Sequence, residues 1–122
     1  MRYDEFNQFC ASLTTTHMVF QWGGSYVWKV DRKVFAVGGW EATEPAFVFK
    51  ASDLVYELLQ KRPGVRPAPY FAARGMKWLQ HFAAPGLDDD ELKDYLRQSH
   101  HLASRNLSKK KRLELGLETP LV

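Results

Sequence analysis

The chain has 122 residues, of which 45% are hydrophobic and 14% aromatic, and its formal net charge is +3. This length is enough for one domain with its own core, and the composition argues against long disordered segments. Cys10 is the only cysteine, which excludes an internal disulfide and a thiolate zinc cluster and favours a reducing compartment. The N-terminus is polar and no apolar run is long enough to span a bilayer, so we expect a cytoplasmic protein without a membrane segment.

The first fifty residues predict a short helix followed by several strands. The apolar residues of that helix recur at helical spacing: Tyr3, Phe6, Cys10 and Leu13. Runs rich in β-forming residues then follow at positions 17–22, 26–30, 33–37 and 47–50. The pair Asp31-Arg32 separates the second run from the third, which is typical of a β-hairpin. Because the connections are short, the sheet is expected to be antiparallel.

A second helix and a stiff segment are predicted next. Ser52 or Asp53 can cap this helix, and Pro63-Gly64 ends it. Its predicted apolar stripe consists of Leu54, Val55, Leu58 and Leu59. After the helix, Pro67 and Pro69 each fix φ near −65° and lack an N–H group, so this segment is an extended connection. Such a segment, with Tyr70 beside it, usually holds a neighbouring element in one place.

The last part of the chain predicts one more strand and a third, longer helix. Residues 76–82 can form the strand, in which we expect Trp78 to pack against a buried Tyr70. Asp88 and Glu91 match a capping pattern that opens the helix. Its core face carries Leu92, Tyr95, Leu96, Ser99, Leu102 and Ala103. The order α-β(3–4)-α-β-α predicts an α+β fold, an antiparallel sheet with helices mainly on one face. We expect a single domain over residues 1–112 and a loosely attached tail over residues 113–122.

Several of these pieces together resemble one known family. They are the hairpin of residues 27–30 and 33–36, the helix end Lys61-Arg62-Pro63-Gly64, the run Arg66-Pro67-Ala68-Pro69-Tyr70, then Trp78, and the helix opened by residues 88–92. The chain is similar to the MmcQ/YjbR family of small bacterial proteins over nearly its whole length, to about Lys111. The resemblance implies a two-layer fold grouped with frataxin-like or secretion-chaperone-like folds. It also implies DNA binding through β-hairpin wings. The hairpin tip departs from the Gly-Gly-Lys common in the family, since Asp31-Arg32-Lys33 stands there.

Nucleic-acid binding requires cations at exposed positions that can meet phosphates. The candidate residues lie at the predicted hairpin and around the proline segment: Lys29, Arg32, Lys33, Arg62, Arg66, Arg74 and Lys77. In addition, residues 97–122 carry six basic and two acidic side chains, which is also typical of a solvated helix end. No helix-turn-helix signal is present, so binding is expected to be weak and largely phosphate-driven.

A second hypothesis is a protein-interaction module. Secretion-chaperone-like folds bind partner chains, and the aromatic excess can supply an apolar docking patch, although most of these rings are expected to lie in the core. Neither hypothesis includes catalysis or a cofactor, because no nucleophile has a base near it in the sequence. Cys10 lies on the apolar stripe of the first helix, where packing is the expected role. We expect a monomer.

We predict that the protein binds neither zinc nor iron stoichiometrically. His17, His81, His100 and His101 are spread over different elements, and the acidic run at 88–91 is explained by helix capping. Calorimetric titration of metal-free protein tests this prediction. A tight one-to-one isotherm that disappears in Asp89→Asn or His101→Ala would contradict it.

Overall fold

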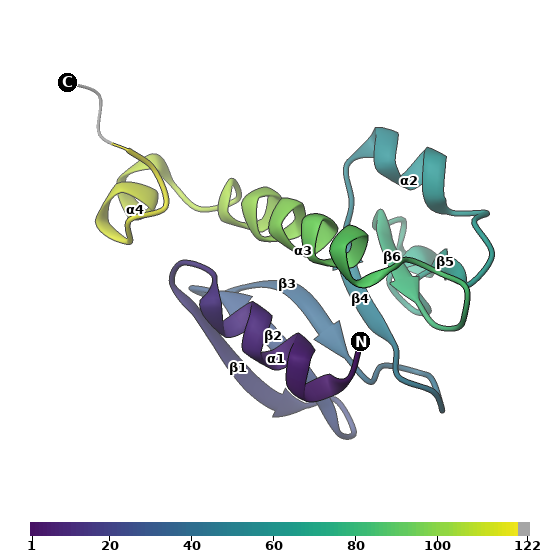
Figure 1. Cartoon of the computed structure of the whole chain (residues 1–122). Helices are drawn as coiled ribbons and strands as arrows, with labels where there is room; N and C mark the ends of the chain where they lie inside the picture. Colours follow the sequence, from purple (N-terminus) through teal and green to yellow (C-terminus); the bar gives the residue numbers. More distant parts are fainter. Residues whose placement is uncertain (120–122) are drawn as a thin grey trace.

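The computed structural model describes residues 1–119, whose centre is a six-stranded antiparallel sheet (Figure 1). The strands in chain order are β1 (Thr16–Gln21), β2 (Ser25–Val30), β3 (Lys33–Gly38), β4 (Phe47–Lys50), β5 (Val65–Pro67) and β6 (Trp78–His81). In the sheet they follow the order β1-β2-β3-β4-β6-β5, and every neighbouring pair is antiparallel. The hairpin of β2 and β3 is confirmed.

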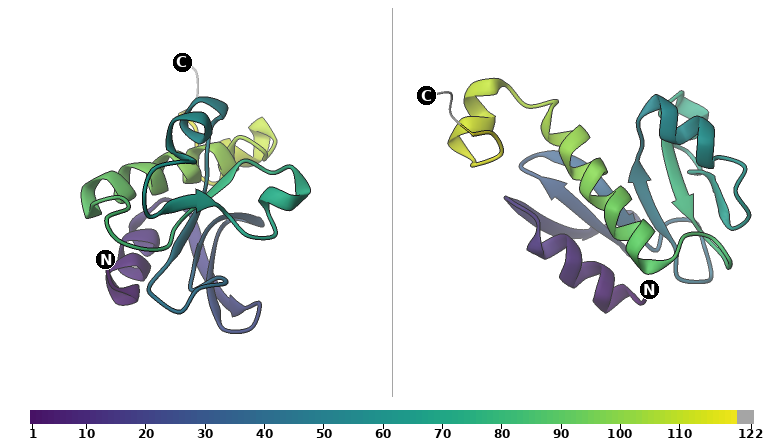
Figure 2. Two further views of the ribbon diagram at one scale, coloured as in Figure 1. Left: turned by 90° about the vertical axis from the view of Figure 1, so that its right-hand side faces the viewer. Right: turned by 45° about the horizontal axis from the view of Figure 1, so that its top comes forward.

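The two longer helices lie on the same face of this sheet. They are α1 (Tyr3–Ser12) and α3 (Asp89–Ser104), which lie side by side in the right-hand view of Figure 2. Two shorter helices, α2 (Asp53–Leu59) and α4 (Lys109–Glu114), lie toward opposite ends of the molecule in Figure 1. The predicted caps are confirmed, since the Ser52 hydroxyl accepts a hydrogen bond from the Val55 N–H and Asp88 forms a capping box with Glu91. The α+β two-layer fold is therefore confirmed.

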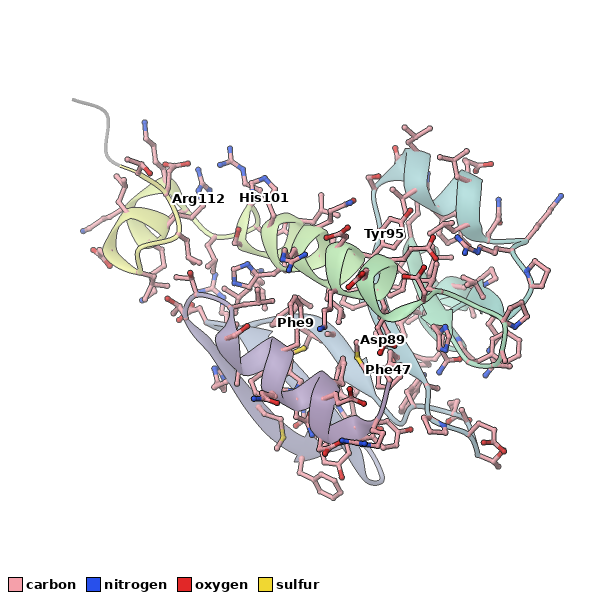
Figure 3. The ribbon with its side chains drawn as sticks, in the orientation of Figure 1. Phe9, Phe47, Asp89, Tyr95, His101 and Arg112 are labelled. Carbon is pink, nitrogen blue, oxygen red and sulfur yellow. The ribbon has the colours of Figure 1, made fainter. Side chains whose placement is uncertain are left out.

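The main core fills the space between the sheet and the two longer helices. Its largest fully buried side chains include Phe6, Phe35, Phe47, Phe49, Leu79, Leu92 and Leu96. Figure 3 shows Phe47 beside the beginning of α1 and below the beginning of α3. A shift in the pairing of β2 with β3 places Ala36 opposite Trp28 and Val34 opposite Lys29. Phe35 is thus an extra, unpaired residue whose ring enters the core.

A single buried hydroxyl joins α3 to the sheet at this bulge. Ser99, which has no exposed surface, donates a hydrogen bond to the Phe35 carbonyl oxygen over 2.5 Å. The same hydroxyl oxygen accepts one from the Lys50 N–H over 2.7 Å. A bulge leaves some backbone groups without a hydrogen-bond partner on the neighbouring strand. The Ser99 side chain of α3 supplies the missing partner.

The proline segment and α2 differ from the sequence prediction. Val65–Pro67 is not only a connection but the edge strand β5, where a proline is tolerated because its missing N–H faces away from the ladder. The expected apolar stripe of α2 is wrong in part: Leu59 is buried, whereas Leu54 and Leu58 are 69% and 68% exposed. The helix α2 has only seven residues and packs near β5 and β6 at the edge of the sheet. It therefore buries only one narrow face.

The predicted C-terminal tail begins within α4, at Leu113, and several contacts hold this part of the chain. The Thr15 hydroxyl donates a hydrogen bond to the Leu115 carbonyl oxygen over 2.7 Å. Glu118 forms ion pairs with Arg105 and Arg112, at 2.9 Å and 3.3 Å. These contacts tie the segment up to Glu118 to the body of the protein, whereas residues 120–122 of the predicted tail lie outside the described residues.

The expected packing of Trp78 is confirmed, but its partner is not the one predicted. Trp78 is 4% exposed and its ring stacks on Phe71, with the centroids 5.1 Å apart. Tyr70, which was expected to be buried there, is 57% exposed. Tyr70 has a φ of +72°, and this left-handed turn leaves its side chain at the surface while the next residue faces the sheet.

We predict that Trp78→Ala destabilises the protein by on the order of 3 kcal/mol, since it removes a large buried side chain and leaves a cavity. Chemical denaturation of both proteins measures this difference. Phe20→Ala is the matched control, because Phe20 is 61% exposed and its truncation should change the free energy of unfolding little. Equal effects of the two substitutions would contradict the prediction.

Candidate functional site: an aromatic groove with a basic end

A groove of about 810 Å³ lies mainly on the face of the sheet opposite α1 and α3, and one end of it reaches the end of α3. Val34 and Trp78, from β3 and β6, contribute to its floor, and the segment between β5 and β6 forms one wall. The lining side chains are mostly aromatic or basic: Trp22, Lys33, Val34, Trp40, Glu41, Lys50, Tyr70, Phe71, Arg74, Met76 and Trp78, with Ala103 and Asn106 from the end of α3 and the turn after it. This size is within the range of pockets that bind small molecules.

The aromatic rings of the groove contact one another in a continuous cluster. Trp40 meets Trp22 edge to face at 5.9 Å and Phe71 at 6.1 Å. Two of the five rings are largely open to solvent: Trp22 is 42% exposed and Tyr70 is 57% exposed. Edge-to-face contacts hold such rings at fixed angles, so these two rings are ordered apolar surfaces at the rim.

Hydrogen bonds fix the wall that carries these rings. The Trp40 indole N–H donates to the Pro69 carbonyl oxygen over 2.9 Å, which joins the loop after β3 to the proline segment. Gln80, fully buried on β6, donates its amide N–H to the Trp40 carbonyl oxygen. The Gln80 amide oxygen accepts from Arg66 Nε over 2.8 Å. The proline segment therefore holds one wall of the groove in place.

The backbone is unusual at three positions around the groove. Among residues 1–119, five residues other than glycine have a positive φ, and three of them line the groove. These are Trp22 at +55°, Glu41 at +46° and Tyr70 at +72°. The left-handed conformation is unfavourable for bulky side chains and persists only where the surroundings enforce it, which is most common at binding and catalytic sites.

Two lysines line one end of the groove. Lys33 at the start of β3 and Lys50 at the end of β4 both line it, next to Asn106. Within the described part of the chain, neither lysine has a carboxylate within 4.0 Å. Desolvation, followed by the charge of Lys33, lowers the pKa of Lys50. A bound anion would relieve this repulsion.

The structure divides the seven predicted phosphate-binding residues into two sets. Lys29, Arg32 and Lys33 lie together on the β2–β3 hairpin, and none of them forms an ion pair among residues 1–119. Arg74 lies at the wall of the groove, where it donates to the Tyr70 hydroxyl over 2.9 Å.

The other three residues are already engaged by protein groups. Arg62 forms a bidentate pair with Glu91, with hydrogen bonds of 2.7 Å and 2.9 Å. Arg66 is hydrogen-bonded to Gln80 and to the Glu41 carbonyl oxygen, and its guanidinium lies 4.4 Å from the ring centroid of Phe82. Lys77 pairs with Asp53 at 3.2 Å.

Tertiary structure brings the hairpin and the basic helix α4 to one end of the molecule. The Asp31 N–H at the hairpin tip donates to the Thr15 carbonyl oxygen, and the Thr15 hydroxyl donates to Leu115 just after α4. Figure 3 shows nitrogen-tipped side chains around α4, where Arg112 is labelled.

Sequence reasoning missed Lys50, because its position as the last residue of a strand gives no sign that it faces Lys33.

Neither a metal-ligating cluster nor an exposed cysteine is found among the described residues. No group of three or more His, Cys, Asp or Glu side chains within residues 1–119 is placed to hold a metal ion. Cys10 is buried in the main core, and burial raises the pKa of its thiol, which disfavours the reactive thiolate. Within the same residues, every helix is too short or too polar to cross a bilayer.

The fold is that of a known class of small α+β proteins. The family model described as YjbR matches residues 11–102, which is most of the chain. The protein belongs to the YjbR family, as the resemblance predicted. No curated protein matches the chain.

Two solved structures share the fold. A crystal structure of the Deinococcus radiodurans protein DR2400, which carries a domain designated DUF419, matches with a TM-score of 0.82 and 20% identity, covering 98% of this chain and 91% of that one. A crystal structure of a protein from Pseudomonas syringae matches with a TM-score of 0.67 and 17% identity, covering 84% and 99% respectively. At these identities the likeness shows the arrangement of the backbone.

We predict that Arg62 stabilises the fold rather than remaining free for a ligand. Its hydrogen bonds lower the pKa of the Glu91 carboxyl, so this pair stabilises the folded state above the ordinary glutamate pKa, and the contribution is lost as the pH falls through the lowered value. Arg62→Gln should therefore raise the pKa of Glu91 toward its ordinary value. It should also reduce the melting temperature near neutral pH but not in strong acid. Carbon-detected NMR titration and melting curves measure these effects.

The control for this prediction is Lys61→Gln, which removes an exposed charge next to Arg62 in the chain. Lys61 has no ion-pair partner among residues 1–119, so the Glu91 titration should stay unchanged. An Arg62→Gln protein that titrates like the parent at Glu91 would show that the pair does not form in solution.

Proposed function

We propose that the protein is a non-catalytic, cytoplasmic nucleic-acid-binding protein that acts as a monomer and binds weakly, mainly through phosphates. The observation that carries this proposal is the meeting of two basic stretches, far apart in the sequence, at one end of the fold. One is the β2–β3 hairpin and the other is α4, and Thr15 lies between them with hydrogen bonds to both.

The balance of charge at this end supports phosphate binding. We define the basic end by nine cations, which are Lys29, Arg32, Lys33, Lys50, Arg105, Lys109, Lys110, Lys111 and Arg112. The same segments carry three carboxylates, those of Asp31, Glu114 and Glu118. Glu118 pairs with Arg105 and Arg112, so seven cations have no ion pair within the described residues. Each cation that meets a phosphate releases a condensed counterion, which is the main source of affinity in non-specific binding.

Arg62, Arg66 and Lys77 are not part of the proposed surface. Each is held by a protein partner, and leaving that partner to meet a phosphate would break an existing interaction. Lys50 and the three lysines of α4 take their place beside the hairpin. Within residues 1–119 we identify no row of side chains suited to base edges, so we expect non-specific affinity, with dissociation constants of roughly 10⁻⁴ to 10⁻⁶ M at physiological salt.

We predict that replacing Arg32 and Lys33 together by Gln weakens binding to unrelated DNA duplexes by a similar factor for each. The slope of log affinity against log salt should become shallower by about 0.9 for each phosphate that the variant no longer neutralises. Replacing Lys109, Lys110 and Lys111 by Gln should have the same kind of effect. Fluorescence anisotropy of labelled duplexes over a salt series measures both quantities.

The matched control replaces two lysines away from the basic end, Lys61 and Lys93, by Gln. This variant loses as much positive charge as the Arg32/Lys33 variant, so a simple effect of net charge would appear in both. We expect the control to bind as the parent does. Absence of detectable binding by the parent protein at low salt would refute the proposed function.

The second candidate function is binding of a partner protein, and the apolar groove is the observation that favours it. Exposed aromatic rings such as Trp22 and Tyr70 are common at protein interfaces. An apolar interface loses little affinity as the salt concentration rises, whereas binding through phosphates loses much. The same salt series therefore separates the two candidates once a binding partner is in hand.

A further inference from the structure

We propose that the aromatic groove receives unpaired bases of a single nucleic-acid strand whose phosphates lie at the basic end. This inference rests on the proposed function and adds to it a preference for single strands over duplexes. It assigns a role to the rings of the groove, which phosphate binding by itself leaves unused.

The groove is continuous with the basic end. Lys33 and Lys50 belong to both, and the groove extends from them along β3 to Trp40, just beyond the end of that strand. A strand of six residues is about 20 Å long. A nucleic-acid strand whose phosphates contact the hairpin can therefore place its next nucleotides along the floor of the groove while it stays bound to the basic end.

The lining of the groove suits the flat faces of bases. Trp22 and Tyr70 are aromatic and largely exposed, and their unusual backbone conformations keep them at the rim. The guanidinium of Arg74 lies 5.6 Å from the ring centroid of Tyr70, which places a cation beside an exposed ring. Proteins that bind single strands without sequence preference combine the same two features, stacking rings and neighbouring cations.

The charges at the two ends of the groove differ, and this difference determines where the backbone of a bound strand is held. Lys33 and Lys50 lie at one end, whereas Glu41 lies beyond β3 near Trp40 at the other. A phosphate is attracted to the lysines and repelled by the carboxylate. The backbone of the strand is therefore anchored at the lysine end, and the nucleotides that follow it bring their bases to the rings.

A duplex cannot use this groove in the same way. Its bases are stacked on one another inside the helix, and their faces are not available to protein rings unless base pairs are broken. Its phosphates can still contact the hairpin and α4. We thus expect duplexes to bind through the basic end alone, whereas single strands bind through the basic end and the groove.

The test compares three labelled probes with the full chain at one salt concentration. They are an oligothymidylate of about ten nucleotides, a duplex of equal length, and an oligomer of equal length with abasic sites in place of the bases. The abasic oligomer keeps the phosphates and removes the groups that would stack. We expect the oligothymidylate to bind more tightly than both other probes.

Two substitutions test the rings, and a third serves as the control. Trp22→Ala and Tyr70→Ala should each weaken oligothymidylate binding by roughly 5- to 150-fold and leave abasic and duplex binding unchanged. Phe20→Ala removes a ring that is more exposed than either but lies outside the groove, so its oligothymidylate binding should equal that of the parent. Circular dichroism of each variant confirms that the fold is retained.

The possible results separate this inference from the proposed function. Equal binding of the oligothymidylate and the abasic oligomer would overturn the inference and leave phosphate-driven binding standing. The same conclusion would follow if Trp22→Ala and Tyr70→Ala behaved like Phe20→Ala in a folded protein. Failure of all three probes to bind at low salt would overturn both.

Discussion

The hydroxyl of Ser99 is the contact on which both faces of the sheet depend. It bridges the Phe35 carbonyl oxygen and the Lys50 N–H at the bulge of β3, with no exposure to solvent. The bulge directs Phe35 into the main core and Val34 to the opposite face, so the core and the groove share one backbone irregularity. Leaving the buried Phe35 carbonyl oxygen without a partner would cost about 1–3 kcal/mol, and the Lys50 N–H would lose its partner as well, which makes this position intolerant of an apolar substitute.

The groove itself depends on a second buried polar side chain and on the stiff proline segment. Gln80 joins Arg66 to the loop after β3, and Trp40 joins that loop to Pro69. Because these bonds link three segments that are distant in the sequence, the groove is an ordered feature and not a gap between mobile loops. The three left-handed residues at its rim are consistent with a backbone that the surroundings hold in place.

Charge at the surface is arranged by ion pairing as much as by composition. The net charge of +3 is modest, yet Arg62, Arg66 and Lys77 are held by protein groups. The cations of the hairpin and the three lysines of α4 have no ion pair within residues 1–119. Weak phosphate binding depends on unpaired cations gathered in one place, and a count over the whole chain does not reveal them. This distinction moves most of the proposed surface away from the proline segment, where sequence reasoning placed four of the seven candidate residues, to the opposite end of the molecule.

The sequence by itself determined the α+β class, the β2–β3 hairpin, the caps at Ser52 and Asp88, and the burial of Trp78. These features follow from local periodicity, from capping residues and from prolines, all of which act over a few neighbouring residues. Only the tertiary structure decided that Phe71 and not Tyr70 packs on Trp78, that Arg62 pairs with Glu91, and that Lys50 faces Lys33. Each of these depends on which strands and loops become neighbours, and on backbone turns such as the one at Tyr70, which the order of residues does not reveal. The groove belongs to this second group, because its walls come from segments far apart in the chain.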